Sequence, residues 1–223
     1  SRVYGDVVNR ILPGAYSKAL SDHGVKPVIS PRINIVQGEE EKDWQFLIKA
    51  AEKPTVELGD YKKTIADLNT KDKIWTPDQA QVGKVEEQKR TKKLNTIIDK
   101  LLEVAKVELG DIFIESEQNR LMTQLVDDVR QAGLTFEQYL ASSGQTQDQI
   151  KERFNKQAET ALKLEFVLEA VADDQKIAAG KDEIEAVIAK ETDPERKKLL
   201  TEQSYAIASI LRREKTVAKL LAL

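Results

Sequence analysis

The sequence carries few side chains that could perform covalent or acid–base chemistry. It contains one histidine, His23, and no cysteine, which excludes a cysteine nucleophile, a disulfide and a thiolate metal site. A catalytic triad needs a base beside its nucleophile, but His23 precedes Gly24 at an expected helix end, where it interacts favourably with the helix dipole. The acidic pairs Asp127-Asp128 and Asp173-Asp174 would point about 100° apart on a helix. They are therefore not expected to share a site.

Sequence motifs for bound phosphate or metal are also missing. No glycine-rich phosphate loop, zinc-protease helix motif or calcium-loop spacing occurs in the chain. A metal site would have to be built almost entirely from carboxylates. We therefore expect no enzyme activity, no cofactor and no bound metal.

Composition narrows the class of protein further. The 223 residues include 35 basic and 38 acidic side chains, which gives a net charge of −3. This balance argues against a nucleic-acid binder driven by bulk charge. The longest apolar run is far shorter than the roughly 20 residues that span a bilayer, and residues 1–4 have no starting methionine or signal-peptide pattern. We expect a soluble chain with no membrane partner, whose first residue marks a processed or engineered start.

The first part of the chain predicts a helix followed by a β-hairpin. Apolar residues recur every three or four positions from Tyr4 to His23, and Pro13 inside this pattern predicts a kink or a restart. Residues 31–36 and 44–48 are typical of two strands, joined by a polar stretch too long for a two-residue turn. We expect an antiparallel hairpin with one face packed against the preceding helix.

A long aperiodic stretch follows the hairpin. The extended run Pro54–Tyr61 leaves the hairpin, and residues 62–82 show neither a helical nor a strand period. Such a stretch is typical of a linker or a functional loop. Trp75 is interpreted as an anchor to a neighbouring surface rather than a ligand contact. We therefore divide the chain into residues 1–61, a linker at 62–83, and a helical domain at 84–223.

Helical patterns dominate after Gly83. One amphipathic helix carries apolar residues from Leu94 to Ala105, and a second ends at Gly133. The longest helix is expected at residues 147–175, with a capping box formed by Thr146 and Gln149. This helix is apolar on almost every side between residues 161 and 172, which predicts a central core element.

The C-terminal part predicts two short helices, broken at residues 192–194, and a final helix over Gln203–Leu223. One apolar face is expected on this final helix, formed by Ile207, Ile210, Leu211, Val217, Leu220 and Leu221.

Basic side chains gather ahead of Leu94: Lys84, Lys89, Arg90, Lys92 and Lys93. Positive charges at a helix N-terminus oppose the helix dipole, so a solvated first turn is one interpretation. Contact with an acidic partner or with nucleic acid is the other.

Several segments, in order along the chain, resemble the bacterial trigger factor family. Residues 4–7, 15–20, 25–28 and 31–33 resemble the second half of its ribosome-binding domain, and residues 54–62 resemble its exit strand. Residues 133–140, 144, 158, 162–164, 167–168 and 182–185 are similar to its C-terminal chaperone domain. The likeness covers nearly the whole chain and depends on order and spacing rather than on one motif.

Two features of that family are not found in this sequence. The ribosome-docking signature, Gly-Phe-Arg-x-Gly-Lys, should lie upstream of Tyr4, and the string occurs nowhere in the chain. The prolyl isomerase domain that usually follows the exit strand is replaced by residues 63–83 alone. The resemblance therefore implies a chaperone body without isomerase activity. Ribosome binding is implied only if a docking loop exists upstream in the full-length protein.

The resemblance also implies a fold and a function. The expected fold is mainly α with a small α+β N-terminal part, in which a hairpin packs on a helix; an elongated multi-helix domain with protruding arms follows as a separate body. The implied function is that of a cytoplasmic, ATP-independent holdase for unfolded or nascent polypeptides, with no direct nucleic-acid contact. A holdase needs broad apolar concave surfaces framed by charge.

Apolar residues of the expected arms and hairpin are the candidate client-binding residues. They are Ile33, Ile35, Phe113, Leu121, Met122, Leu125, Val129, Leu140 and Phe154. Ordinary core packing is the alternative role for each, because the same stripe serves both purposes. Two other functions stay open at this point: a helical adaptor that recognises one defined partner, and a periplasmic chaperone of the parvulin type.

Overall fold

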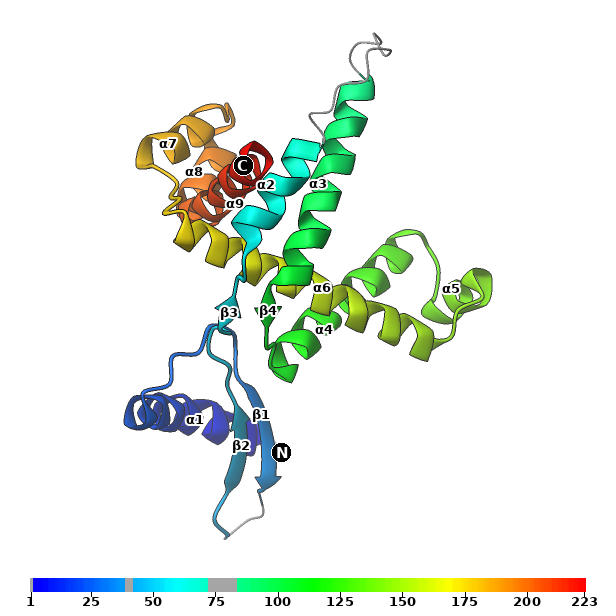
Figure 1. The fold of residues 1–223 in the computed structure, drawn as a ribbon. Helices are drawn as coiled ribbons and strands as arrows, with labels where there is room; N and C mark the ends of the chain where they lie inside the picture. Colours follow the sequence, from blue (N-terminus) through cyan, green and yellow to red (C-terminus); the bar gives the residue numbers. More distant parts are fainter. Residues whose placement is uncertain (1, 39–41, 72–83) are drawn as a thin grey trace. The chain divides into compact units, whose positions relative to one another are not determined.

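The computed structural model describes residues 2–38, 42–71 and 84–223. Two compact units divide the chain: unit 1 comprises Ser1–Pro54 and Leu109–Ala158, and unit 2 comprises Thr55–Glu108 and Glu159–Leu223. Most described residues are helical, and the strands form only two small two-stranded sheets (Figure 1). The predicted mainly α fold with a small α+β N-terminal part is confirmed.

Unit 1 begins with helix α1 (Arg2–His23), which continues through Pro13. Proline removes one backbone donor and crowds the preceding turn, yet it neither ends nor restarts this helix. Gly24 follows with φ +66°, a left-handed conformation that glycine adopts without a Cβ clash. The helix therefore ends where the sequence predicted, with His23 in its last turn.

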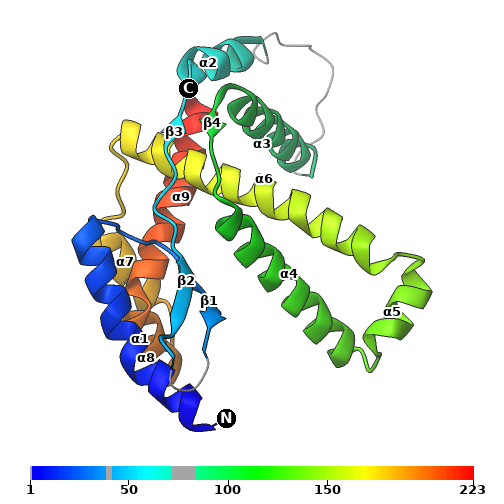
Figure 2. The ribbon, with the colours of Figure 1, turned by 90° about the horizontal axis from the view of Figure 1, so that it is seen from below.

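The predicted hairpin is present in unit 1. Strands β1 (Arg32–Gln37) and β2 (Gln45–Lys49) pair antiparallel, with Ile33 opposite Ile48 and a register irregularity between Ile35 and Gln37. Figures 1 and 2 both show α1 beside the hairpin. This placement agrees with the packing expected from the sequence.

The rest of unit 1 is helical. It consists of α4 (Asp111–Gln131), α5 (Phe136–Ser143) and the first part of α6 (Gln147–Asp174). The Gln149 N–H donates to Thr146 Oγ1 at 3.2 Å, and the Thr146 N–H donates to Gln149 Oε1 at 2.9 Å. The predicted capping box is therefore confirmed, and it starts the longest described helix.

Unit 2 contains five further helices and the second part of α6. They are α2 (Tyr61–Lys71), α3 (Lys84–Val104), α7 (Lys181–Ala189), α8 (Pro194–Glu202) and α9 (Ser204–Ala222). Its core is a cluster of buried side chains from α2, α3, α6 and α9, together with Ala105: Tyr61, Ile65, Ile97, Leu101, Ala105, Val167, Leu168, Val171 and Leu220. Residues of α6 form a large share of this core, as their all-round apolar pattern predicted.

One prediction is wrong for the segment after the hairpin. Residues 62–71 were expected to be linker, but they belong to α2, in which Tyr61 and Ile65 are 3% and 0% exposed. The helix is short, so its intrinsic helix propensity stabilises it only weakly. Packing of its apolar side against the rest of unit 2 contributes more to its stability. Residues 72–83, with Trp75, lie outside the described residues, and the domain boundaries stay a prediction.

A pair of two-residue strands joins the two ends of the segment that contains α2 and α3. Strand β3 (Val56–Glu57) pairs antiparallel with β4 (Lys106–Val107). Gly59 follows β3 with φ +56°, and a Cβ at this position would lie 2.8 Å from the Val104 carbonyl oxygen. Only glycine fits this turn without strain, because both its conformation and its close backbone contact exclude a side chain.

The C-terminal helices follow the predicted order, with one difference on α9. Asp193 caps α8 by accepting hydrogen bonds from the Glu195 and Arg196 N–H groups, and the break between α7 and α8 is confirmed. Ile207 and Leu220 of α9 are buried, but Ile210 is 59% exposed. The apolar residues of α9 are therefore not all covered, because they spread too widely around the helix to be buried together.

Candidate functional site

An open groove runs between α6 and α9 in unit 2, and we call it the α6–α9 groove. Its volume is about 400 Å³, within the range of small-ligand and side-chain sites. The lining residues are Glu165, Leu168, Glu169, Ala172, Ile177, Ala178, Ala179, Tyr205, Ala208, Ser209, Ile210, Arg212, Arg213 and Thr216. Small and apolar side chains dominate its interior, so it can receive apolar groups of varied shape.

Polar contacts from α9 hold the segment that closes this groove. The Arg212 Nε donates to the Ile177 carbonyl at 2.8 Å, and the same guanidinium pairs with Asp173. The Lys215 ammonium donates to the Ala178 carbonyl at 2.8 Å and pairs with Glu183 at 2.9 Å. These bonds satisfy carbonyl groups of a non-helical segment, so residues 177 and 178 form a fixed wall.

Exposed apolar side chains mark the rim of the groove. Tyr205 is 88% exposed and Ile210 is 59% exposed. Burial of a large apolar side chain contributes roughly 1.5–3 kcal/mol to binding or folding. A partner that covers Tyr205 and Ile210 would therefore gain free energy that the isolated chain leaves unused.

Charges frame the apolar rim on two sides. Glu165 and Glu169 line it from α6, and Arg212 and Arg213 line it from α9. Such charges keep an exposed apolar surface soluble. The arrangement suits non-covalent contact with apolar side chains.

A second exposed apolar surface lies on the hairpin of unit 1, and we call it the hairpin patch. It consists of Ile33 and Ile35, which are 41% and 57% exposed. Leu47, which is 50% exposed, pairs with Asn34 and lies on the opposite face of the hairpin. Ile33 and Ile35 lie opposite Ile48 and Phe46 in the register and share a face with them. Both long edges of this two-stranded sheet are free of a further strand among the described residues.

The structure separates the sequence-predicted site residues by burial. Ile33 and Ile35 are exposed within the hairpin patch, whereas Phe113, Val129 and Phe154 are only 4%, 6% and 7% exposed. The remaining four are half-buried: Leu121, Met122, Leu125 and Leu140. The three buried residues pack inside unit 1, which agrees with core packing, the alternative role given for each candidate. Client binding by any of the nine stays a prediction.

Sequence reasoning missed the exposed residues of α9. Tyr205 and Ile210 lie on the same helix as the buried Ile207, Thr216 and Leu220. The available signal was the presence of large apolar residues on more than one side of a helix that ends the chain. It could indicate excess apolar surface, but only the fold places that surface beside α6.

A polar cluster fixes α2 against the end of α6 in unit 2. The Tyr61 hydroxyl donates to Asp174 Oδ2 at 2.5 Å, and Lys62 Nζ lies 2.8 Å from the same oxygen. Burial, with help from the Asp174 hydrogen bond, raises the pKa of Tyr61 to about 12. Hydrogen bonds from Lys62, then Tyr61 and Gln175, lower the pKa of Asp174 to about 2. Every member of the cluster makes an internal contact, so the cluster holds α2 against the end of α6.

The described part of the chain has neither a metal-ligand cluster nor a membrane-spanning helix. Within residues 2–38, 42–71 and 84–223, no group of three or more histidine, aspartate and glutamate side chains could hold a metal ion. None of the described helices has an apolar stretch long enough to cross a bilayer.

Comparisons with known proteins agree with this architecture. The family model for the bacterial trigger factor C-terminus matches residues 78–222, and a second bacterial trigger factor model matches residues 1–89. A trigger factor from Agathobacter rectalis is 30% identical over 186 residues, which cover 82% of this chain and 38% of that protein. A trigger factor from Streptococcus suis is 43% identical over 60 residues, 27% of this chain and 14% of that protein.

A solved structure shares the fold. It is described as "Promiscuous Substrate Recognition in Folding and Assembly Activities of the Trigger Factor Chaperone" and aligns with a TM-score of 0.56 at 13% identity, over 88% of this chain and 79% of that one. The chain spans less than two fifths of the length of each of these two relatives. Since the C-terminal family model covers more than half of its residues, the chain belongs to the bacterial trigger factor family.

Proposed function

We propose that this chain is an ATP-independent chaperone that holds unfolded or nascent polypeptides through exposed apolar surfaces. One observation carries the proposal: large apolar side chains stay exposed at the α6–α9 groove and at the hairpin patch, with Tyr205 88% exposed. A chain with a well-formed core gains nothing in stability from such residues. Membership of the trigger factor family supports the same function.

The chemistry of these surfaces favours weak binding of many sequences. The α6–α9 groove is open and lined by small or flexible side chains, and it holds no buried charge that would select one partner. Specificity for one partner requires groups that reject the others. A surface of this kind tolerates many apolar segments, which is what a holdase requires.

The test is suppression of aggregation. A chemically unfolded model protein is diluted into buffer with and without near-stoichiometric amounts of the chain, in the absence of ATP, and light scattering is followed. We expect the chain to slow aggregation. Unchanged aggregation, together with tight binding of a single native protein, would replace the chaperone by the adaptor.

Isomerase activity is not part of the proposal. The two family matches overlap at residues 78–89, so no inserted domain lies between the regions that they cover. We propose that the chain does not accelerate cis–trans isomerisation of an X-Pro peptide. Acceleration in a standard peptide assay would overturn this part of the proposal and leave the holdase function standing.

The location and the ribosome partner are proposed on family membership alone. We propose a cytoplasmic protein whose clients include nascent chains, and ribosome binding that depends on a docking loop upstream of Tyr4. Cosedimentation with purified ribosomes tests the second point. Ribosome binding by the chain as given would show that such a loop is not required.

A further inference from the structure

A second groove in unit 2 has a different chemical character, and we call it the basic groove. It lies between α2, α3 and α9 and has a volume of about 990 Å³. Its lining residues are Leu68, Asn69, Lys89, Arg90, Lys92, Lys93, Thr96, Ile97, Ala218, Leu221 and Ala222. None of these lining residues is acidic and four are cationic, so the charged side chains that line the groove are all positive.

Asn69 provides the second observation. Its side chain is 5% exposed, and neither its amide nitrogen nor its amide oxygen has a hydrogen-bond partner among the residues that the structure describes. Buried amides are almost always paired, because an unpaired donor or acceptor costs folding free energy. An amide that offers one donor side and one acceptor matches the N–H and C=O groups of an extended main chain.

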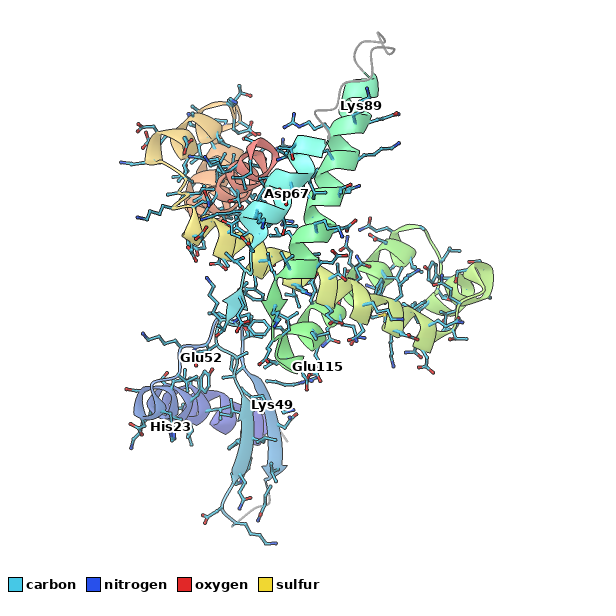
Figure 3. The ribbon with its side chains drawn as sticks, in the orientation of Figure 1. His23, Lys49, Glu52, Asp67, Lys89 and Glu115 are labelled. Carbon is cyan, nitrogen blue, oxygen red and sulfur yellow. The ribbon has the colours of Figure 1, made fainter. Side chains whose placement is uncertain are left out.

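The four cations of the basic groove lie close together on α3. Lys89 and Lys93 are four residues apart, and Lys89 and Lys92 are three apart, so they share one side of the helix. Among the described side chains, no ion pair involves Lys89, Arg90, Lys92 or Lys93. Figure 3 shows Lys89 on α3, with Asp67 on the neighbouring helix α2. Mutual repulsion of these cations would fall when carboxylates approach them.

We infer that the basic groove binds an extended polypeptide segment in which acidic side chains flank an apolar one. Its main chain would pair with the Asn69 amide, and its carboxylates would meet the cations of α3. The apolar side chain would contact Leu68 and Leu221, which are half-buried. This site is separate from the proposed holdase surfaces. It recognises acidic side chains together with an apolar one, whereas those surfaces bind apolar side chains alone.

Nucleic acid fits the same groove less well. Single-stranded nucleic acid is held by aromatic side chains on which bases stack, in addition to cations that meet phosphates. The lining residues of the basic groove include no aromatic side chain. A peptide uses the amide, the cations and the apolar residues together, whereas a phosphate backbone would use only the cations.

Fluorescence anisotropy with the full chain tests the inference. The probes are a short labelled peptide that alternates glutamate and leucine, the same peptide with lysine in place of glutamate, and a single-stranded RNA of similar length. We expect binding of the glutamate peptide that weakens as salt rises. Equal binding of the two peptides, or tighter binding of the RNA, would overturn the inference.

Two variants locate the site. We expect K92E/K93E to weaken binding of the glutamate peptide about tenfold or more, because charge reversal turns attraction into repulsion. The matched control is K197E/K198E on α8, which changes the net charge equally but lies outside the lining residues. An equal loss in both variants would assign the effect to net charge and refute the site.

Asn69→Leu separates binding from folding. Leucine removes the unpaired amide at similar volume, so we expect an unchanged or higher melting temperature together with weaker peptide binding. Peptide binding equal to that of the original chain would refute pairing between Asn69 and the main chain. Aggregation suppression is measured on the same samples, so that failure of the holdase function is distinguished from failure of this site.

Discussion

The core of unit 2 and the hairpin of unit 1 use the same kinds of side chain in opposite ways. Ile65 and Ile97 are 0% and 1% exposed in unit 2, whereas Ile35 and Val36 are 57% and 64% exposed on the hairpin. Helices α2, α3, α6 and α9 surround one another's apolar faces. A two-stranded sheet can have little more than one face covered. Apolar content alone therefore does not distinguish core from binding surface; the number of neighbouring elements does.

The same contrast recurs within α9. Thr216 and Leu220 are 0% and 1% exposed, and Tyr205, three turns earlier, is 88% exposed. One helix thus contributes to the core at its end and to the α6–α9 groove at its start. Variants at its two ends, and in the two units, should separate stability from binding.

The largest effect is expected in the core of unit 2. Leu101 is 0% exposed, and Leu101→Ala should lower the free energy of unfolding by about 3 kcal/mol, through lost burial and an unfilled cavity. Urea denaturation followed by circular dichroism measures this change. The matched control is Leu199→Ala at a 53% exposed position of α8, expected to change stability by less than about 1 kcal/mol. Equal losses would break the distinction between core and surface.

A backbone substitution should have the next largest effect. Gly59→Ala places a Cβ 2.8 Å from the Val104 carbonyl oxygen in a left-handed conformation, and we expect a loss of about 2 kcal/mol. Gly133→Ala in unit 1 has a similar φ of +77° but meets no atom within 4 Å, so about 1 kcal/mol is expected. The difference between the two variants measures the contact itself. No difference would show that conformation alone accounts for both losses.

Removal of one hydroxyl should have a smaller effect. Tyr61→Phe deletes the hydrogen bonds with Asp174 and Gln175 but keeps the buried ring. We expect a loss of about 1 kcal/mol, measured by thermal melting. Leu164→Met, a volume-conserving change beside the same core, serves as the control for packing. A stability unchanged by Tyr61→Phe would remove this cluster from the contacts that hold α2.

The same cluster predicts how stability varies with pH. Folding raises the pKa of Tyr61 to about 12, so its contribution is complete below about pH 10 and is lost as pH rises through 12. Folding lowers the pKa of Asp174 to about 2, so that contribution is complete above about pH 4 and is lost as pH falls through 2. Absorbance at alkaline pH should show one of the five tyrosines ionising last. Loss of this last ionisation step in Tyr61→Phe would identify Tyr61 as the group. Persistence of the step in the variant would assign it to another tyrosine.

The last variant should have the smallest effect on stability but a large effect on the binding of unfolded chains. Tyr205 is 88% exposed, so Tyr205→Ser should change the free energy of unfolding by no more than about 0.5 kcal/mol. Aggregation suppression should fall, because the α6–α9 groove loses its largest exposed ring. Leu134→Ser, at a 43% exposed position of unit 1 outside both proposed surfaces, is the control. Equal suppression by Tyr205→Ser and the original chain would remove this groove from the proposed function.

Local signals made much of the fold predictable. The capping box at Thr146 and Gln149, the break before Pro194 and the end of α1 at Gly24 all depend on residues within a few positions of one another. A second capping box, Thr135 with Gln138, has the same spacing and was overlooked. The sequence contained that signal as clearly as the first.

Non-local packing accounts for what was missed. Tyr61, Ile65 and Leu68 lie on one side of α2, but this spacing is too short to appear as a sustained period in the sequence. Tyr61 is also stabilised by a hydrogen bond to Asp174, which lies 113 residues further along the chain. The α6–α9 groove likewise joins residues near 170 to residues near 210. No pattern within one segment indicates which distant segment will lie beside it.

The pairing of β3 with β4 has a consequence for how this chain can change in length. The chain leaves at Glu57 and returns at Lys106, directly opposite, so everything between these residues is a detour that starts and finishes at one point. Residues added to or removed from the detour leave the spacing of its two ends unchanged. Doubling such a loop costs only about 0.6 kcal/mol of closure entropy. The two-residue ladder therefore fixes the two ends of this stretch, so a change of length between α2 and α3 keeps the register as long as both helices keep the side chains that form the core of unit 2.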